Sequence, residues 1–162
     1  MQHMSRLSSC VILDPALLEP QIGNHYPEPY KSNSAGREKR ALGKAARLTN
    51  FGVNLTTLTP GTWSAQRHWH TKQDEFVYIL DGEVTLVTDD GEAVLKAGMA
   101  VGFKAGVPNG HHLVNKSDRP VTYLEIGDRS PDDEVDYPDI DMTGRFHPMG
   151  RFKFFDRKGQ PY

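Results

Sequence analysis

The sequence contains a single cysteine and no long apolar run. Cys10 cannot form a disulfide within the chain, and one thiol excludes a zinc site built from several thiolates. No apolar run approaches the ~18 residues that a membrane-spanning helix needs, and the start of the chain lacks the apolar core of a signal peptide. These absences predict a cytoplasmic protein without a membrane partner.

An excess of charge of one sign is also absent. The chain has 19 Lys and Arg residues against 21 Asp and Glu residues, which gives a formal net charge of -2. Nucleic acids and anionic membranes are held mainly by strongly basic surfaces, so we expect neither as a partner. No segment resembles a glycine-rich phosphate loop, a βαβ unit or a helical repeat.

The length of 162 residues suits one domain rather than two. A domain of this size buries roughly two-thirds of the surface that its unfolded chain exposes, so one core is sufficient. The 15 glycines and 11 prolines indicate a fold with many turns. We therefore expect a single globular unit.

Short strands separated by turns are expected between residues 51 and 127. Asp81-Gly82 is typical of a tight hairpin, which would join the run 76–80 to a return strand at 84–88. Strands that recur at this spacing predict an all-β sandwich or barrel. The remaining expected strands are 51–58, 92–95, 99–103, 111–115 and 121–126.

The two flanks differ from this middle part. Residues 1–50 are rich in proline and predict an extended N-terminal arm, with a short strand at 11–13 and one or two helical turns within 36–48. Residues 128–162 begin acidic and end aromatic and basic, which is too apolar for a free tail. We expect this tail to pack on the barrel or on a partner subunit.

Four histidines, two of them in His68-Trp69-His70, are the strongest chemical signal. Side chains at positions i and i+2 of a strand point to the same face, so His68 and His70 can hold one ion together. Glu75 opens the next strand, and His111 comes from a strand far along the chain. Three imidazoles and a carboxylate suit Fe(II), Mn(II), Co(II), Ni(II), Cu(II) or Zn(II).

Two positions of this predicted site have a competing neighbour. His112 follows His111, and Asp74 precedes Glu75, so each is an alternative ligand. Four protein ligands in an octahedral shell leave two positions open for water or substrate, as a catalytic site requires.

The spacing of these residues resembles that of the cupin family. The first cupin motif matches Gly61 to Gly82 and includes His68-Trp69-His70 and Glu75. The second matches Ala105 to His111. The spacing to Gly82 favours Glu75 over Asp74, and the spacing from His111 to Asn115 favours His111 over His112. The resemblance implies metal binding by His68, His70, Glu75 and His111.

The resemblance also implies a double-stranded β-helix, or jelly-roll, barrel that is usually a homodimer. The motifs cover residues 51–127, and the flanks are similar to a bacterial subgroup of cupins that indicates no substrate. Isomerases, dioxygenases, decarboxylases and lyases all occur on this barrel, and the fold does not select among them. A small metalloenzyme acting on a small oxygen-rich metabolite, sugar-like or carboxylate, is the expected function.

A cupin that binds or senses a small ligand without turnover is the alternative function. No general base can be assigned; Gln66, Tyr123 and Glu125 are only the nearest candidates. Four aromatic residues are candidates for a pocket wall, although such side chains more often belong to a core or an interface. They are Trp63, Phe76, Tyr78 and Phe103.

Overall fold

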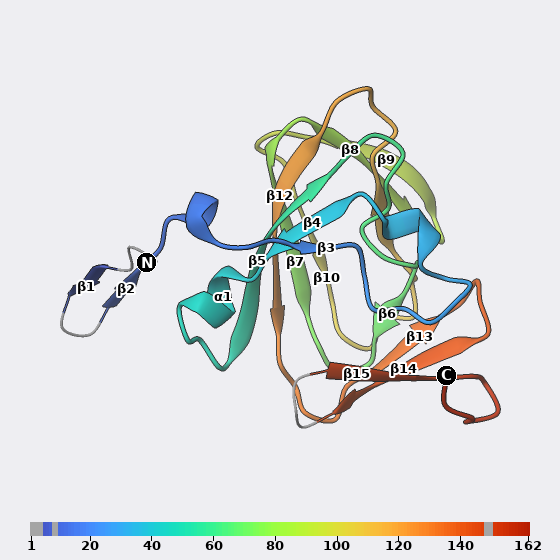
Figure 1. The fold of residues 1–162 in the computed structure, drawn as a ribbon. Coiled ribbons are helices and arrows are strands. Elements are labelled where there is room, and N and C mark those ends of the chain that lie inside the picture. The colour runs from blue at the N-terminus through green and yellow to red at the C-terminus, as the bar shows by residue number, and fades with distance from the viewer. Residues whose placement is uncertain (1–4, 8–9, 148–150) are drawn as a thin grey trace.

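The computed structural model describes residues 5–7, 10–147 and 151–162, and the other parts of the expected arm and tail lie outside the described residues. The regular secondary structure of the described chain is almost entirely antiparallel β-strand, arranged around a barrel (Figure 1). The flanking elements before the barrel are β1 (Ser5–Leu7), β2 (Cys10–Ile12), β3 (Gln21–Ile22), β4 (Arg37–Arg40) and the one-turn helix α1 (Leu42–Ala45), with 3-10 turns at Pro15–Leu17 and Ser32–Ser34. The barrel strands are β5 (Phe51–Leu58), β6 (Trp69–His70), β7 (Glu75–Asp81), β8 (Glu83–Thr88), β9 (Gly91–Lys96), β10 (Ala100–Phe103), β11 (His112–Val114) and β12 (Val121–Asp128). The last strands are β13 (Glu134–Tyr137), β14 (Met142–His147) and β15 (Arg151–Phe155).

Three sheets enclose the interior. The largest has the strand order β10-β7-β12-β5-β4-β3, and a smaller one has the order β11-β8-β9. The third sheet, β15-β14-β13-β6, joins the last strands of the chain to β6 through the register Val135 to His70. The all-β jelly-roll expectation is confirmed, with strands far apart in sequence lying side by side.

The hairpin expected at Asp81-Gly82 is wrong. β7 lies between β10 and β12 in the large sheet, so both of its edges are already paired. β8 therefore cannot return along β7, and it pairs with β9 and β11 in the smaller sheet. Gly82, at a φ of 79°, turns the chain from one sheet to the other.

The sequence between residues 36 and 48 contains a strand that was not expected. β4 pairs with β5 over Arg37 to Arg40, and only one helical turn follows, in α1. The buried Arg37 side chain donates to the backbone oxygens of Gly23 and Ser64, which holds β4 against the barrel. The expected short strand near residue 11 is present as β2.

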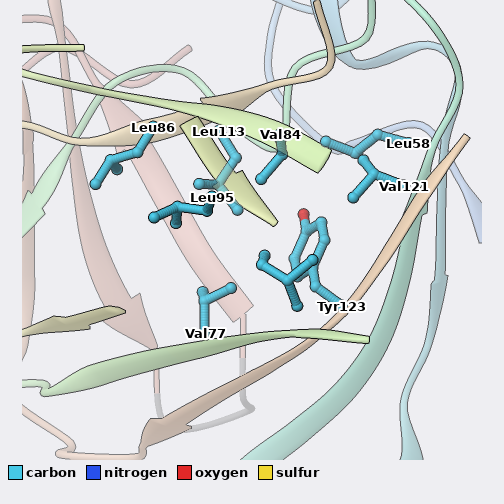
Figure 2. Close-up of a cluster of buried hydrophobic side chains, with 9 residues drawn as sticks. Leu58, Val77, Val84, Leu86, Leu95, Leu113, Val121 and Tyr123 are labelled. Atoms are coloured by element: carbon cyan, nitrogen blue, oxygen red, sulfur yellow. The ribbon is translucent and has the colours of Figure 1, made fainter. Parts of the chain in front are cut away.

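The main core fills the space between the two barrel sheets (Figure 2). Along β7, Val77 and Ile79 are buried, whereas Phe76, Tyr78 and Leu80 alternate with them on the exposed face. This alternation places Glu75 on the inner face of β7, above the core. The buried core residues are Leu58, Val77, Ile79, Val84, Leu86, Leu95, Leu113, Val121 and Tyr123.

A second apolar cluster, Tyr26, Val135, Tyr137 and Met142, lies under the sheet formed by the last strands. Within the described parts of the chain, no helix has the length and apolar character needed to cross a membrane.

Candidate metal centre

Three histidines and one glutamate converge where three strands meet. His70 lies on β6, Glu75 begins β7, and His68 and His111 form an isolated antiparallel bridge just before β6 and β11. The Oε2 atom of Glu75 lies 2.8 Å from Nε2 of His111, 3.5 Å from Nε2 of His70 and 3.7 Å from Nε2 of His68. We refer to these four residues as the His3-Glu cluster.

Hydrogen bonds on the far side of two rings orient them toward the centre. Nδ1 of His68 lies 2.8 Å from the carbonyl oxygen of Gln66, and Nδ1 of His70 lies 2.6 Å from Oδ2 of Asp133. Both partners are acceptors, so each Nδ1 carries the proton and each Nε2 presents its lone pair to the cluster. Carboxylates and carbonyls behind ligand histidines are typical of metal sites.

The charges of the cluster are strongly coupled. Burial lowers the pKa of His68 to about 3, which keeps this ring neutral at pH 7. Burial alone would raise the pKa of Glu75, but the hydrogen bond with His111 and the charges of His70 and His68 outweigh it and hold the pKa below its ordinary value. Glu75 is therefore an anion facing three imidazoles, a donor set that suits a divalent cation.

The two alternative ligands lie elsewhere. The Asp74 carboxylate accepts a hydrogen bond of 2.7 Å from the backbone amide of Ala105, which closes a loop at the end of β10. The His112 ring faces the opposite side of its strand, with Nδ1 3.1 Å from the carbonyl of Ala65 and its ring edge-on to Trp63. The structure thus brings together the four residues predicted from the motifs and neither alternative.

Aromatic side chains pack against the cluster. The Phe103 ring stacks on His111 with 3.5 Å between the ring centres, Tyr137 packs beside His68, and Phe152 packs beside His70. Of the four aromatic residues considered for a pocket wall, Phe103 lines the cavity at this stack and Phe76 lines its rim. Phe76 and Tyr78 are exposed on the outer face of β7, and Trp63 packs against His112 instead.

Asp133 and Tyr137 were missed by the sequence analysis. Asp133, only 1% exposed, also accepts a hydrogen bond of 2.8 Å from the amide of Lys72. Its only sequence signal is its place in the acidic run after residue 131, where most neighbours are exposed carboxylates. Pairing of β13 with β6 is what brings it to His70, and no spacing rule along the chain anticipates that pairing.

The cluster lies in a half-open cavity of about 1120 Å³, lined by barrel strands together with residues of the N-terminal flank and the last strands. The cavity walls also include Lys39, Asn54 and Glu125 from the inner face of the large sheet. Glu125 forms an ion pair with Lys39, and the Asn54 amide donates to the same carboxylate. The cavity thus combines a cluster of metal-ligand type with a second polar group and apolar walls, as in a small-molecule site.

Comparison with known proteins identifies the family. A family model described as a cupin domain matches residues 54–127. The crystal structure of a sugar phosphate isomerase of the cupin superfamily from Silicibacter pomeroyi is 41% identical, with a TM-score of 0.88, and the alignment covers 93% of this chain and 96% of that one. This chain belongs to the cupin superfamily.

Two further structures place this cupin among its relatives. A candidate sugar phosphate isomerase from Acidithiobacillus ferrooxidans is 30% identical, with a TM-score of 0.69, covering 75% of this chain and 77% of that one. A protein from Thermotoga maritima described as a predicted oxalate decarboxylase is 19% identical, with a TM-score of 0.59, covering 74% of this chain and 99% of that one. At this identity the similarity supports the fold alone. No curated protein matches this cupin.

The donor set of the His3-Glu cluster fits a metal ion. Ligands bound at about 2.0–2.2 Å to one ion lie about 3 Å from their neighbours in the coordination shell. The separations of 2.8 to 3.7 Å between Glu75 and the three histidines are close to that value. The ligand atoms of His68, His70 and Glu75 also lie within 4.8 Å of one another, and His111 adjoins this group through Glu75, so the donor set is suited to one ion.

Proposed function

We propose that this cupin is a metal-dependent isomerase that acts on a sugar phosphate. The observation that carries the proposal is the convergence of His68, His70, His111 and Glu75 in the wall of a half-open cavity. The two relatives at 41% and 30% identity, one a sugar phosphate isomerase and one a candidate for that activity, support the substrate class.

The four residues of the cluster would hold one divalent transition metal ion. When bound, such an ion polarises a carbonyl or hydroxyl oxygen and stabilises negative charge on it. Asp133 and the Gln66 carbonyl keep the Nε2 atoms of His70 and His68 directed at that position. Phe103 and Tyr137 pack against the His111 and His68 rings from the side and limit their movement.

The cavity also suits the charge of a sugar phosphate. Arg129 and Lys153 line its wall, and their positive charge favours a phosphate group, which carries up to two negative charges at neutral pH. Polar groups of Asn54 and Gln73 offer hydrogen bonds to sugar hydroxyls. Arg129 and Lys153 thus support a phosphate group, and Asn54 and Gln73 support sugar hydroxyls, as contacts in one cavity.

Turnover of aldose and ketose phosphates tests this proposal. We expect the purified protein, loaded separately with Mn(II), Fe(II), Co(II), Ni(II) and Zn(II), to interconvert at least one aldose phosphate and its ketose in a panel of three- to six-carbon compounds. Glu75→Gln should reduce the rate at least 100-fold, because it removes the only anionic donor of the cluster. Binding of a panel member by calorimetry without any turnover would contradict the isomerase and favour a ligand-binding cupin.

We also propose that the protein forms a homodimer. The outer face of the large sheet exposes Phe76, Tyr78 and Leu80, and the β1–β2 hairpin extends away from the barrel in Figure 1. A second copy covering that face would bury this apolar surface. Light scattering should give twice the mass of one chain, and the mass of a single chain would contradict the dimer.

A further inference from the structure

Glu125 occupies the inner face of the large sheet next to the His3-Glu cluster. β12 pairs with β7 so that Glu125 lies opposite Val77 and Gly127 lies opposite Glu75. Glu125 is thus the diagonal neighbour of Glu75 on the same face, at a Cα separation of roughly 7–8 Å. A ligand that touches the cluster therefore extends naturally toward the Glu125 carboxylate.

The two oxygens of the Glu125 carboxylate have different surroundings. Lys39 and Asn54 both contact Oε1, with the Asn54 amide at 3.1 Å. No described residue donates a hydrogen bond to Oε2. The Glu125 side chain is 24% exposed, and the residue lines the cavity. The carboxylate is held by one oxygen while the other stays accessible to a ligand.

The supporting residues come from two neighbouring strands. Asn54 lies opposite Glu125 in the register of β5, and Lys39 lies opposite Thr56 in the register of β4. The Lys39 side chain is only 23% exposed. A lysine and a glutamate turned inward together cost desolvation energy that a solvent-facing pair avoids, so packing alone does not account for them.

We propose that Glu125 is the proton-transfer residue of this enzyme and that Lys39 and Asn54 hold it in position. This inference rests on the proposed isomerase function. In the reaction, Glu125 Oε2 removes the proton from C2 of a 2-hydroxy aldehyde. The C2–H electron pair forms the C1–C2 double bond, and the carbonyl electron pair moves onto O1.

The reverse movements complete the isomerisation. The hydroxyl proton passes from O2 to O1 as the carbonyl forms at C2, and the double-bond electron pair takes the proton back from Glu125 at C1. One C–H and one O–H bond break and one of each forms, so no oxidant or co-reactant is needed. Proton transfer by a positioned side chain is worth about 10²–10⁴ in rate.

The test compares three variants on the sugar phosphate that the wild-type enzyme converts fastest. Glu125→Gln should lower kcat at least 100-fold and abolish incorporation of deuterium from D2O into the sugar. Its metal content should stay at the wild-type level, and its affinity for the sugar phosphate by calorimetry should stay within about threefold. Glu125→Asp keeps the charge beside Lys39 but withdraws it by one methylene group, so it should fold and lose kcat with little change in KM.

The matched control is Glu38→Gln, the same substitution at a glutamate on the opposite face of the large sheet. Glu38 neighbours Lys39 on β4, and its 42% exposed side chain pairs with Arg40. This variant should retain wild-type kcat. Wild-type kcat in Glu125→Gln, or loss of its metal or sugar affinity, would overturn the role of Glu125 alone. No turnover of any panel member by the wild type would overturn the isomerase and this role together.

Discussion

The single contact that best distinguishes the His3-Glu cluster from a chance group of histidines is the one between His70 and Asp133. The distance from Nδ1 to Oδ2 is 2.6 Å, and Asp133 is fully enclosed. Burial lowers the pKa of His70, but the hydrogen bond and charge of Asp133, with the charge of Glu75, outweigh it and raise the pKa overall. Such a buried carboxylate fixes which ring nitrogen faces the metal position.

Replacing Asp133 with Asn should weaken metal binding about 10- to 100-fold. An amide nitrogen facing the protonated Nδ1 would repel it, and the tautomer that avoids this repulsion puts the proton on Nε2. Competition with a chelator measures the affinity. Asp132→Asn, at the exposed neighbouring position, is the control and should match the wild type. Equal metal affinity in both variants would show that Asp133 does not orient His70.

The four cluster residues were predictable because their spacing along the chain follows two short motifs. Their partners were not. Strand pairings between the barrel and its flanks bring Asp133 to His70 and Lys39 to the cavity. Glu125 was one of three candidate bases in the sequence, and only the register of β12 with β7 places it beside Glu75. Registers between distant strands depend on the whole set of packed faces, which no local pattern encodes.

At the scale of elements, the turn residues in the sequence predicted the ends of the strands more accurately than they predicted which strands pair. The bounds of β5 match the expected run 51–58, and the chain turns at Asp89-Asp90, just before Gly91, in the hairpin between β8 and β9. Asp81-Gly82 carries the same local signal yet connects two different sheets. The difference arises because β7 has partners on both edges, a fact of topology rather than of turn chemistry.

Gly82→Ala tests this connection. Gly82 has a φ of 79°, and an added Cβ would lie 2.8 Å from the carbonyl oxygen of Pro120. We expect the left-handed conformation to cost about 1–2 kcal/mol and the backbone contact to add a comparable amount. Gly98→Ala, at a φ of 87° with open space around the added Cβ, should lose only the free energy of the left-handed conformation. Equal losses of unfolding free energy in urea would contradict the close approach of β12.

At the scale of the whole molecule, the His3-Glu cluster is where all three sheets of the barrel meet. Glu75 belongs to the large sheet, His70 to the sheet of the last strands, and His111 adjoins β11 of the smaller sheet. An ion bound by these side chains would link the sheets and raise the stability of the folded state by mass action. The jelly-roll topology thus gathers these side chains from distant parts of the chain, an arrangement that the composition alone does not indicate.

The central claim is that these four side chains bind one metal ion, and elemental analysis of purified protein tests it most directly. We predict about one equivalent of a transition metal in the wild type and in His25→Ala, whose exposed imidazole lines the cavity outside the cluster. The double variant His68→Ala, His111→Ala should contain little or none. A wild-type protein that stays without metal after anaerobic reconstitution, or a double variant that keeps its full equivalent, would contradict the claim.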